Sequence, residues 1–320
     1  MFPDDKASTH IAAVEAAYFE AYLSFNNLAF PAQMSSMLGS KAILAKAGIA
    51  CHPVSYVLPT DASEFLAKFQ ETASQGRLWL YKPAKQSGGN GIVAFSDEVT
   101  AMKLVEKAGE QDVMQQYVQS ILIDNCKVDM RVYVLVTERQ DFGLHAYLYK
   151  QGFMRSCVKK YDGKSTDLSC HLTNVSFAKR NKLQQRVYEL EDDEIRNRFD
   201  WQNLKDSIVQ SLSGILKQHQ EIPSSCVCYL CKRGCAQLFG FDILVDDMKK
   251  AWILEANIHP KLRFDERKVD RSLFRDIIKI LVGEEGWDNE SLGSFAGHIG
   301  KKDLWFDGAF DGKPEFYRLL

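Results

Sequence analysis

Two apolar strand segments near residue 250 constrain the fold more than any other feature of the chain. Leu238–Asp246 and Ala251–Asn257 are rich in β-forming residues and only a short polar turn separates them, so we expect an antiparallel hairpin. Glu255 and Asn257 are two residues apart and share a face, and Asp242 can lie across from them. Two carboxylates and an amide oxygen among apolar neighbours suit Mg²⁺ better than they suit a solvated strand end. The hairpin therefore predicts a magnesium site.

A second hairpin carries a glycine-rich turn. Leu78–Pro83 is typical of a strand and residues 91–95 of its return. Gly89 and Gly91 would let backbone N–H groups approach phosphate oxygens, and Lys82 would supply a positive charge. The turn is neither a Walker A loop nor a dinucleotide fingerprint, because no Gly-Lys-Ser/Thr follows and the next element is a strand. Such a hairpin is more often a plain turn, so it does not assign a phosphate site by itself.

Charged residues alternate along a third strand segment, residues 127–136. Lys127, Asp129 and Arg131 are spaced by two and share one face, which we expect to be exposed where the strand begins and buried where it ends. One interpretation is a solvated charged stripe. The other is that the two cations neutralise phosphates or a carboxylate and that Asp129 orients them, with Arg155 adding a second guanidinium from a neighbouring strand.

The remaining patterns mix helices with strands. Helical periodicity is expected over residues 7–24, 40–47, 62–75, 99–109, 184–218 with a break near Asp200, and 268–282. Further strands are expected over residues 54–59, 113–118, 144–149 and 152–161. This succession predicts an α+β fold.

A polar segment, His171-Leu172-Thr173-Asn174, lies between these strands. A lone histidine is more often packed or solvated than catalytic. The Thr173 hydroxyl and the Asn174 amide are groups that can bond a ribose or a phosphate.

Four of the eight cysteines fall in one short segment, Cys226 to Cys235, with the spacing C-x-C-x2-C-x3-C. Structural zinc sites usually pair two distant knuckles, and no second knuckle follows here. We therefore favour reduced, buried thiols over a zinc site.

Composition bounds the class of protein. The chain has 320 residues, with 40 Lys+Arg against 42 Asp+Glu, so bulk charge does not predict nucleic-acid binding. No apolar run reaches the about 18 to 20 residues that span a bilayer, and the acidic first residues do not resemble a secretory signal. A cytoplasmic protein without a membrane span is expected, acting as a monomer.

These segments, in this order, resemble the tubulin tyrosine ligase-like family, a branch of the ATP-grasp ligases. The similarity extends from about Lys41 to Gly283. The matching pieces are Lys82-Pro83 with Gly89-Asn90-Gly91-Ile92, Gln115-Gln116-Tyr117-Val118, Lys127-Val128-Asp129-Met130-Arg131, Gly152–Arg155, His171-Leu172-Thr173-Asn174, and Leu238–Asp242 with Trp252–Asn257.

The resemblance implies an ATP-grasp fold, in which two lobes of mixed or antiparallel sheet with flanking helices hold a nucleotide between them. It divides the chain into a short N-terminal helical segment (1–40), a first ATP-grasp lobe (41–118), a second lobe with the Mg²⁺ site (119–285) and a tail (286–320). The adenine would lie against the hinge formed by Gln115, Gln116, Tyr117 and Val118.

The resemblance also implies a role for each site residue. Nucleotide phosphates would be held by Lys82, Gly89, Gly91, Lys127 and Asp129, and Lys41 is a further candidate. His171, Thr173 and Asn174 would line the region where the nucleotide meets an incoming amino acid. Asp242, Glu255 and Asn257 would hold Mg²⁺, with two ions expected. The catalytic set would be Arg131, Arg155, Lys127 and Glu255.

The activity implied is that of an ATP- and Mg²⁺-dependent carboxylate–amine ligase. An acyl phosphate would form from the carboxylate of a protein, a peptide or a small acid, with tubulin as one candidate, and an amino acid or another amine would then attack it. The alternatives are an inactive ATP-binding scaffold and a phosphotransferase using the same nucleotide site. No His-Arg-Asp or Asp-Phe-Gly segment supports a protein kinase.

One segment departs from the family pattern. Ile258-His259-Pro260-Lys261 follows Asn257, where small or hydroxyl residues are common before the proline. A bulky residue and two cations would alter the acceptor end of the site. We expect His259 or Lys261 to contact an acidic group of the substrate.

Overall fold

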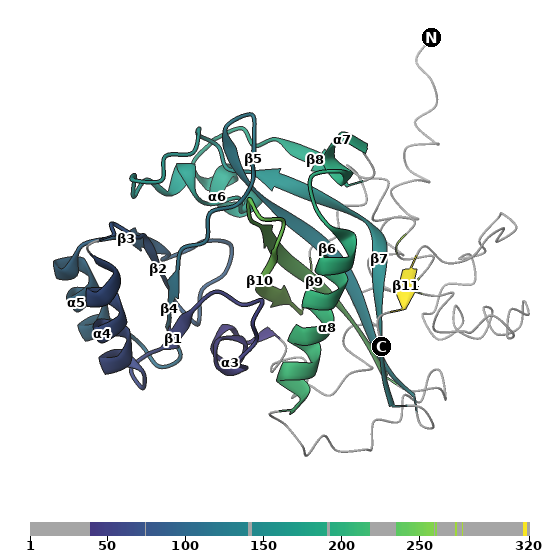
Figure 1. Ribbon diagram of the computed structural model, residues 1–320, viewed down its shortest axis with the longest axis horizontal. Helices are drawn as coiled ribbons and strands as arrows, with labels where there is room; N and C mark the ends of the chain where they lie inside the picture. Colours follow the sequence, from purple (N-terminus) through teal and green to yellow (C-terminus); the bar gives the residue numbers. More distant parts are fainter. Residues whose placement is uncertain are drawn as a thin grey trace, which may run out of the picture.

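The computed structural model describes residues 39–73, 75–139, 143–190, 193–217 and 235–258, together with 260, 273, 277 and 316–318. Two antiparallel sheets of unequal size lie next to each other, each with helices packed against it (Figure 1). The predicted α+β class is confirmed.

The smaller sheet has the strand order β1-β4-β2-β3. Its strands are β1 (Ser55–Val57), β2 (Trp79–Lys82), β3 (Val93–Phe95) and β4 (Val113–Gln116). Helices α4 (Ala62–Ala73) and α5 (Glu98–Lys107) pack against it, and the core between them is aromatic, with Trp79 and Phe65 in edge-to-face contact at 5.3 Å. Asp97 caps α5 by accepting a hydrogen bond from the Thr100 N–H.

The larger sheet has seven strands and the main order β10-β9-β6-β7-β11, with β5 paired to β6 and β8 to β7. The strands are β5 (Leu122–Ile123), β6 (Cys126–Arg139), β7 (Gly143–Ser156), β8 (Val187–Glu189), β9 (Cys235–Val245), β10 (Ala251–Asn257) and β11 (Phe316–Arg318). Helix α8 (Trp201–Lys217) covers one face, and its Leu204, Ile208 and Leu212 belong to the same core as the sheet. Shorter helices are α6 (Val175–Arg180), α7 (Asp193–Arg196) and a 3-10 turn (Leu168–Cys170).

The segment from α3 (Lys41–Lys46) to Pro53 connects the two sheets. Ala42 packs with residues of the smaller sheet, whereas Leu44 and Cys51 lie in the core of the larger one. The carbonyl of Cys51 also accepts a hydrogen bond from the Ile253 N–H at 2.8 Å. This segment therefore helps to fix the position of one sheet relative to the other.

Three predictions about the larger sheet need correction. The segments 144–149 and 152–161 are not two strands, because β7 is continuous and only its pairing with β6 shifts register there. Residues 187–189 form β8 rather than helix, since they pair with the edge of β7. The charged start of β6 is not exposed: Lys127 and Asp129 are buried, because Lys127 packs over the Tyr117 ring and Asp129 pairs with Arg155 of β7.

Some predictions fall outside the described residues. These are the helix at 7–24, most of the helix at 268–282, the cysteines at 226–231, and His259 and Lys261. Leu273 and Ile277 of the second helix are described and both are buried. Among the described residues, no helix is long and apolar enough to cross a membrane.

Candidate nucleotide and metal site

A cleft runs between the two sheets, where the β2–β3 hairpin faces strands β6, β9 and β10. Apolar side chains line it, with Leu80, Ile92 and Val118 from β2 and the segments beside β3 and β4, and Leu244 and Leu254 from β9 and β10. Apolar walls on two sides suit a flat, aromatic base.

Most of the predicted site residues come together in this cleft. Those that line it are Lys82, Gly89, Gln115, Gln116, Val118, Lys127, Asp129, His171, Thr173, Asn174, Asp242 and Glu255. Those that do not line it are Gly91, Tyr117, Arg131, Arg155 and Asn257. Residues outside the predicted site set also line it, among them Pro53, Gln86 and Leu172.

The free volume of the cleft is small. It is about 80 Å³, below the roughly 300 Å³ at which ligand pockets usually start. A nucleotide would therefore require the β2–β3 hairpin to move or the long side chains in the cleft to turn.

Three glycines shape the loop between β2 and β3. Gly88, Gly89 and Gly91 all have positive φ, at 61°, 80° and 66°, a conformation that glycine adopts without strain. A Cβ on Gly89 would lie 3.2 Å from Leu172, and one on Gly91 would lie 2.9 Å from Pro83. Gly89 therefore faces the cleft, and Gly91 folds the loop back on its own start.

Two lysines bring positive charge into the cleft. Lys82 donates to Gln115 Oε1 at 2.5 Å, and Lys127 lies over the Tyr117 ring with its Nζ 3.9 Å from the centroid. Burial lowers the pKa of Lys82 to about 8. Burial and the nearby Lys82 charge lower the pKa of Lys127 to about 7. An anionic partner would stabilise the charged form of both lysines.

Tyr117 does not line the cleft, and a hydrogen bond to His171 fixes the position of its ring. His171 Nε2 lies 2.7 Å from the Ser165 carbonyl, so this nitrogen carries the proton, and His171 Nδ1 accepts from the Tyr117 hydroxyl at 2.9 Å. Burial lowers the pKa of His171, which favours this neutral form. The Tyr117 ring is held under Lys127 as a result.

The two arginines lie behind the cleft, on two buried carboxylates. Arg131 donates to both oxygens of Asp242, from Nε at 2.5 Å and from an Nη at 3.0 Å. Arg155 donates to both oxygens of Asp129 and also lies 3.1 Å from Asp242. Burial opposes ionisation of Asp242, but the two guanidiniums outweigh it and hold its pKa well below the usual value.

The predicted metal ligands converge across the β9–β10 pair. Glu255 lies opposite Asp242, as the two-residue spacing predicted, and Asn257 Nδ2 lies 3.3 Å from Glu255 Oε1 and 3.4 Å from Asp242 Oδ2. Burial and the Asp242 charge raise the pKa of Glu255. A divalent cation would relieve this repulsion, and the donors are the oxygen type that Mg²⁺ takes.

These three side chains fit Mg²⁺ only in part. Among the described residues, no group of three or more His, Cys, Asp or Glu side chains could hold a metal ion. Asp242 also already accepts from two guanidiniums. Oxygens from outside the protein, such as those of a nucleotide, would have to complete the coordination.

A model of one protein family matches residues 17–287, which is most of the chain. The chain belongs to the tubulin-tyrosine ligase family. The predicted family is confirmed, and with it the ATP-grasp fold, whose two lobes correspond to the two sheets. The exact lobe boundaries, 41–118 and 119–285, stay a prediction.

The curated relatives are described as tubulin-modifying enzymes. The chain is 34% identical to a probable tubulin polyglutamylase of Mus musculus over 251 residues, which are 72% of this chain and 44% of the relative. It is 28% identical to a probable alpha-tubulin polyglutamylase of Tetrahymena thermophila, covering 75% of this chain and 62% of the relative. It is 29% identical to a tubulin monoglutamylase of Mus musculus, covering 73% and 20%. The chain thus spans less than two thirds of each of these relatives.

The sequence analysis did not find a series of hydrogen bonds that runs from Ile253 through His52 and Gln115 to Lys82. His52 Nδ1 lies 2.8 Å from the Ile253 carbonyl and therefore carries the proton. His52 Nε2 then accepts from Gln115 Nε2 at 3.2 Å, and Gln115 Oε1 accepts from Lys82. The chain connects β10 of one sheet to the lysine of the other. No local pattern could reveal it, since His52 and Ile253 are 201 residues apart.

This chain predicts a specific acid sensitivity. Burial lowers the pKa of His52 from 6.5 to about 4. Between these values the unfolded protein binds a proton that the folded protein does not, so the stabilisation is complete above pH 6.5 and is lost as the pH falls towards 4. We expect the difference in unfolding free energy between the parent and a His52→Asn variant to shrink by about 3 kcal/mol across this window.

Urea unfolding of both proteins, followed by tryptophan fluorescence at several pH values, measures this difference. Above pH 6.5 the difference should be constant, which serves as the internal control. A difference that stays the same down to pH 4 would show that His52 is not held neutral in the folded protein.

Proposed function

We propose that this protein is an ATP- and Mg²⁺-dependent carboxylate–amine ligase that adds an amino acid to a carboxylate of another protein. The observation that carries the proposal is the convergence of Lys82 and Lys127 with Asp242 and Glu255 in one cleft between the sheets. The lysines are placed to neutralise phosphates, and the carboxylates to hold a metal ion. The relatives, which are described as probable tubulin polyglutamylases, favour glutamate as the amino acid and tubulin as the first acceptor to test.

The proposed reaction has two steps. A carboxylate oxygen of the acceptor attacks the γ-phosphorus of ATP, the bond from that phosphorus to the β-phosphate oxygen breaks, and ADP leaves. The neutral amine then attacks the acyl carbon, and the bond between this carbon and the phosphate oxygen breaks. Inorganic phosphate leaves, and the amine loses one proton. The products are an amide, ADP and phosphate.

The residues of the cleft would act by position and charge. Phosphoryl transfer requires alignment and charge neutralisation more than a protein nucleophile. Lys82 and Lys127 would bind phosphate oxygens, and the apolar residues around Val118 would bind the base. Arg131 and Arg155 would keep Asp242 ionised, and Arg155 would hold the Asp129 carboxylate in place. Asp242, Glu255 and Asn257 would hold Mg²⁺, which would supply positive charge to offset the charge that develops during phosphoryl transfer.

One experiment separates this proposal from its alternatives. The protein is incubated with Mg-ATP, glutamate and purified tubulin, and ADP release and the intact mass of tubulin are followed together. A mass gain of one or more glutamyl residues with matching ADP supports the ligase. A gain of one phosphate would instead indicate a phosphotransferase. ATP binding without ADP release, also with other amino acids and acidic proteins, would indicate a scaffold.

Nucleotide binding should also take up protons. Because the pKa of Lys127 is about 7 in the free protein, this lysine is largely neutral at about pH 8 and must gain a proton beside a phosphate. We expect proton uptake at about pH 8 and much less at about pH 6, where Lys127 is already charged. The affinity for ATP should accordingly weaken as the pH rises above 7.

Calorimetry in two buffers of different ionisation enthalpy measures this uptake. The matched variant is Lys127→Arg, which keeps the positive charge but does not titrate in this range. It should bind ATP with less proton uptake than the parent, and the remainder would come from Lys82. Equal uptake by the two proteins would mean that Lys127 does not meet the phosphates.

A further inference from the structure

The loop between β2 and β3, residues 83–92, closes the nucleotide cleft. Gly88, Gly89, Asn90 and Ile92 of this loop line the cleft, whose free volume is about 80 Å³. Sites for small molecules usually start at roughly 300 Å³, so the cleft must widen before a nucleotide can bind. Of the two ways to make room, moving the loop is the one that also opens a path from solvent. The contacts that hold the loop down therefore control entry.

The start of the loop is fixed and is not the part that moves. Asp112, just before β4, is buried and accepts hydrogen bonds on both carboxylate oxygens, from the Ala84 N–H and the Gly109 N–H at 2.8 Å each. The Tyr81 hydroxyl also donates to it. Pro83 has no N–H, so the ladder between β2 and β4 ends before it and Asp112 binds the next N–H along the chain. Movement is therefore confined to the residues after Ala84.

The tip of the loop is held from the other sheet, by helix α6. An Nη of Arg180, the last residue of α6, donates to the Gly88 carbonyl at 3.0 Å. The Gly88 backbone also lies directly on this helix, because a Cβ there would be 2.9 Å from the Ser176 Cβ. Gln185, just beyond α6, donates to the Ser156 carbonyl at the end of β7 at 2.8 Å, so this segment is tied to the larger sheet. The Arg180–Gly88 contact thus joins the two sheets across the cleft.

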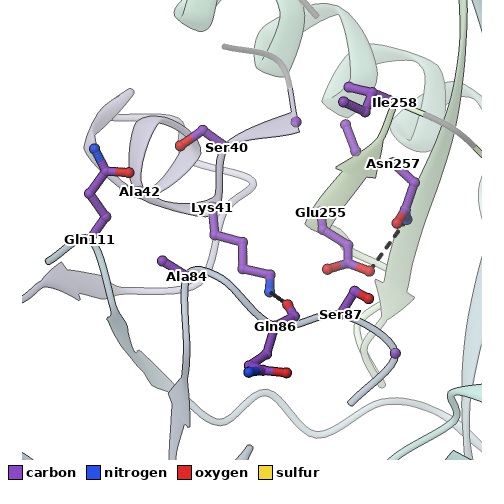
Figure 2. Close-up of a pocket in the computed structure, with 13 residues that line it drawn as sticks. Ser40, Lys41, Ala42, Ala84, Gln86, Ser87, Gln111, Glu255, Asn257 and Ile258 are labelled. Atoms are coloured by element: carbon purple, nitrogen blue, oxygen red, sulfur yellow. Dashed lines mark hydrogen bonds between the residues drawn. The ribbon is translucent and has the colours of Figure 1, made fainter. Parts of the chain in front are cut away.

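A lysine holds the other side of the loop. Lys41 of α3 donates to the Gln86 carbonyl at 2.9 Å, and Figure 2 shows this bond between the helix and the loop. Lys41 is itself a candidate for phosphate binding, so a nucleotide would attract its ammonium group away from the carbonyl. Arg180 does not line the cleft. Its contact with Gly88 can therefore be removed without changing a residue that is proposed to bind the nucleotide.

The Arg180–Gly88 hydrogen bond is weak enough to open. Arg180 is exposed, and a single hydrogen bond at the protein surface contributes little net free energy, because water competes for both groups. Gly88 and Gly89 lack a Cβ, which leaves the backbone at the tip free to change conformation. Closed and open forms of the loop can therefore exchange while the rest of the fold stays intact.

We propose that the Arg180–Gly88 contact is autoinhibitory: it holds the loop over the empty cleft, and a nucleotide enters only after this contact opens. The inference rests on the proposed function only for the nucleotide itself, and it adds the residue that limits entry. When the open form is a minor one, the apparent Kd is the intrinsic Kd divided by the open fraction. Removing the contact should therefore raise the association rate and the affinity together.

Charge alone predicts the opposite sign. A nucleotide is an anion, so the loss of a cation beside the cleft should slow association and weaken binding. The direction of the change therefore distinguishes the two effects. Lys179→Gln removes an exposed cation at the neighbouring position of the same helix and is the matched control for Arg180→Gln. Arg180→Lys keeps both the charge and a donor for the Gly88 carbonyl, so it should resemble the parent.

Stopped-flow mixing with a fluorescent N-methylanthraniloyl analogue of ATP and Mg²⁺ measures these rates. For Arg180→Gln we expect association to be roughly three- to tenfold faster and Kd to fall by a similar factor, with little change in dissociation. For Lys179→Gln we expect association at the parent rate or slightly slower. Association in Arg180→Gln that is no faster than in Lys179→Gln would overturn the proposal.

Trypsin cleavage without nucleotide measures the opening of the loop by itself. Lys85 is exposed within the loop, and the bond after it should be cut faster in Arg180→Gln than in Lys179→Gln, as read from fragment masses. Equal cleavage would show that Arg180 does not hold the loop. Faster cleavage with unchanged binding would show that the loop does not limit entry, and the ligase proposal would stand. If neither the parent nor Arg180→Gln binds the analogue, the ligase proposal fails as well.

Discussion

A Glu255→Gln variant is expected to fold like the parent and to lose ligase activity by about 10²- to 10³-fold or more. Glutamine keeps the shape of the side chain but removes the negative charge that would hold Mg²⁺ opposite Asp242. Partial burial and Asp242 already raise the pKa of Glu255, so the free protein tolerates a neutral group at this position. The loss should therefore appear in turnover and in Mg²⁺ affinity rather than in stability.

Three measurements check this prediction together. ADP release gives turnover, titration of the ATP-loaded protein gives Mg²⁺ affinity, and urea unfolding gives stability. Glu110→Gln, at an exposed position away from the cleft, is the matched control and should behave like the parent. Full activity in the Glu255→Gln protein would remove Glu255 from the proposed metal site.

The second large effect is on stability. Replacing Asp129 by asparagine should lower the free energy of unfolding by about 3 kcal/mol, because removing one partner of a buried ion pair leaves the other charge without compensation. Arg155 donates to both oxygens of Asp129 deep in the larger sheet. The neighbouring Asp242 would offset part of the loss, since Arg155 also lies 3.1 Å from it.

Urea unfolding with near-UV circular dichroism measures this change. The matched control is Asp167→Asn, which breaks the ion pair with Lys159 at the surface, where 58% and 42% of the two side chains are exposed. Exposed pairs contribute little, so the unfolding midpoint should hardly move. Equal midpoints for the two variants would mean that the Asp129–Arg155 pair does not stabilise the fold.

The sequence predicted what depends on local spacing. The β9–β10 hairpin and the placement of Glu255 opposite Asp242 follow from a period of two and a short turn, and both are observed. The glycine turn between β2 and β3 follows from composition in the same way. These features involve residues close in the chain, where pattern and geometry are tightly linked.

The sequence could not predict which partner a side chain takes across the sheet. Spacing placed Lys127, Asp129 and Arg131 on one face, but Arg131 pairs with Asp242, 111 residues away, and Asp129 pairs with Arg155. The Tyr117 ring that covers Lys127 also comes from outside the strand, so the periodicity of the strand does not encode this burial. The roles of these residues in nucleotide and metal binding stay predictions that the variants above test.

The segment before β1 has a consequence for how the protein is made on the ribosome. Leu44 and Cys51 complete the core of the larger sheet, and the Cys51 carbonyl and the His52 ring both bond to Ile253 on β10. This early segment is thus synthesised long before its partner strand. The core of the larger sheet cannot be completed until β10 has left the exit tunnel, so the apolar residues of this segment wait with exposed surface until then. That interval is where we expect the growing chain to depend most on a chaperone.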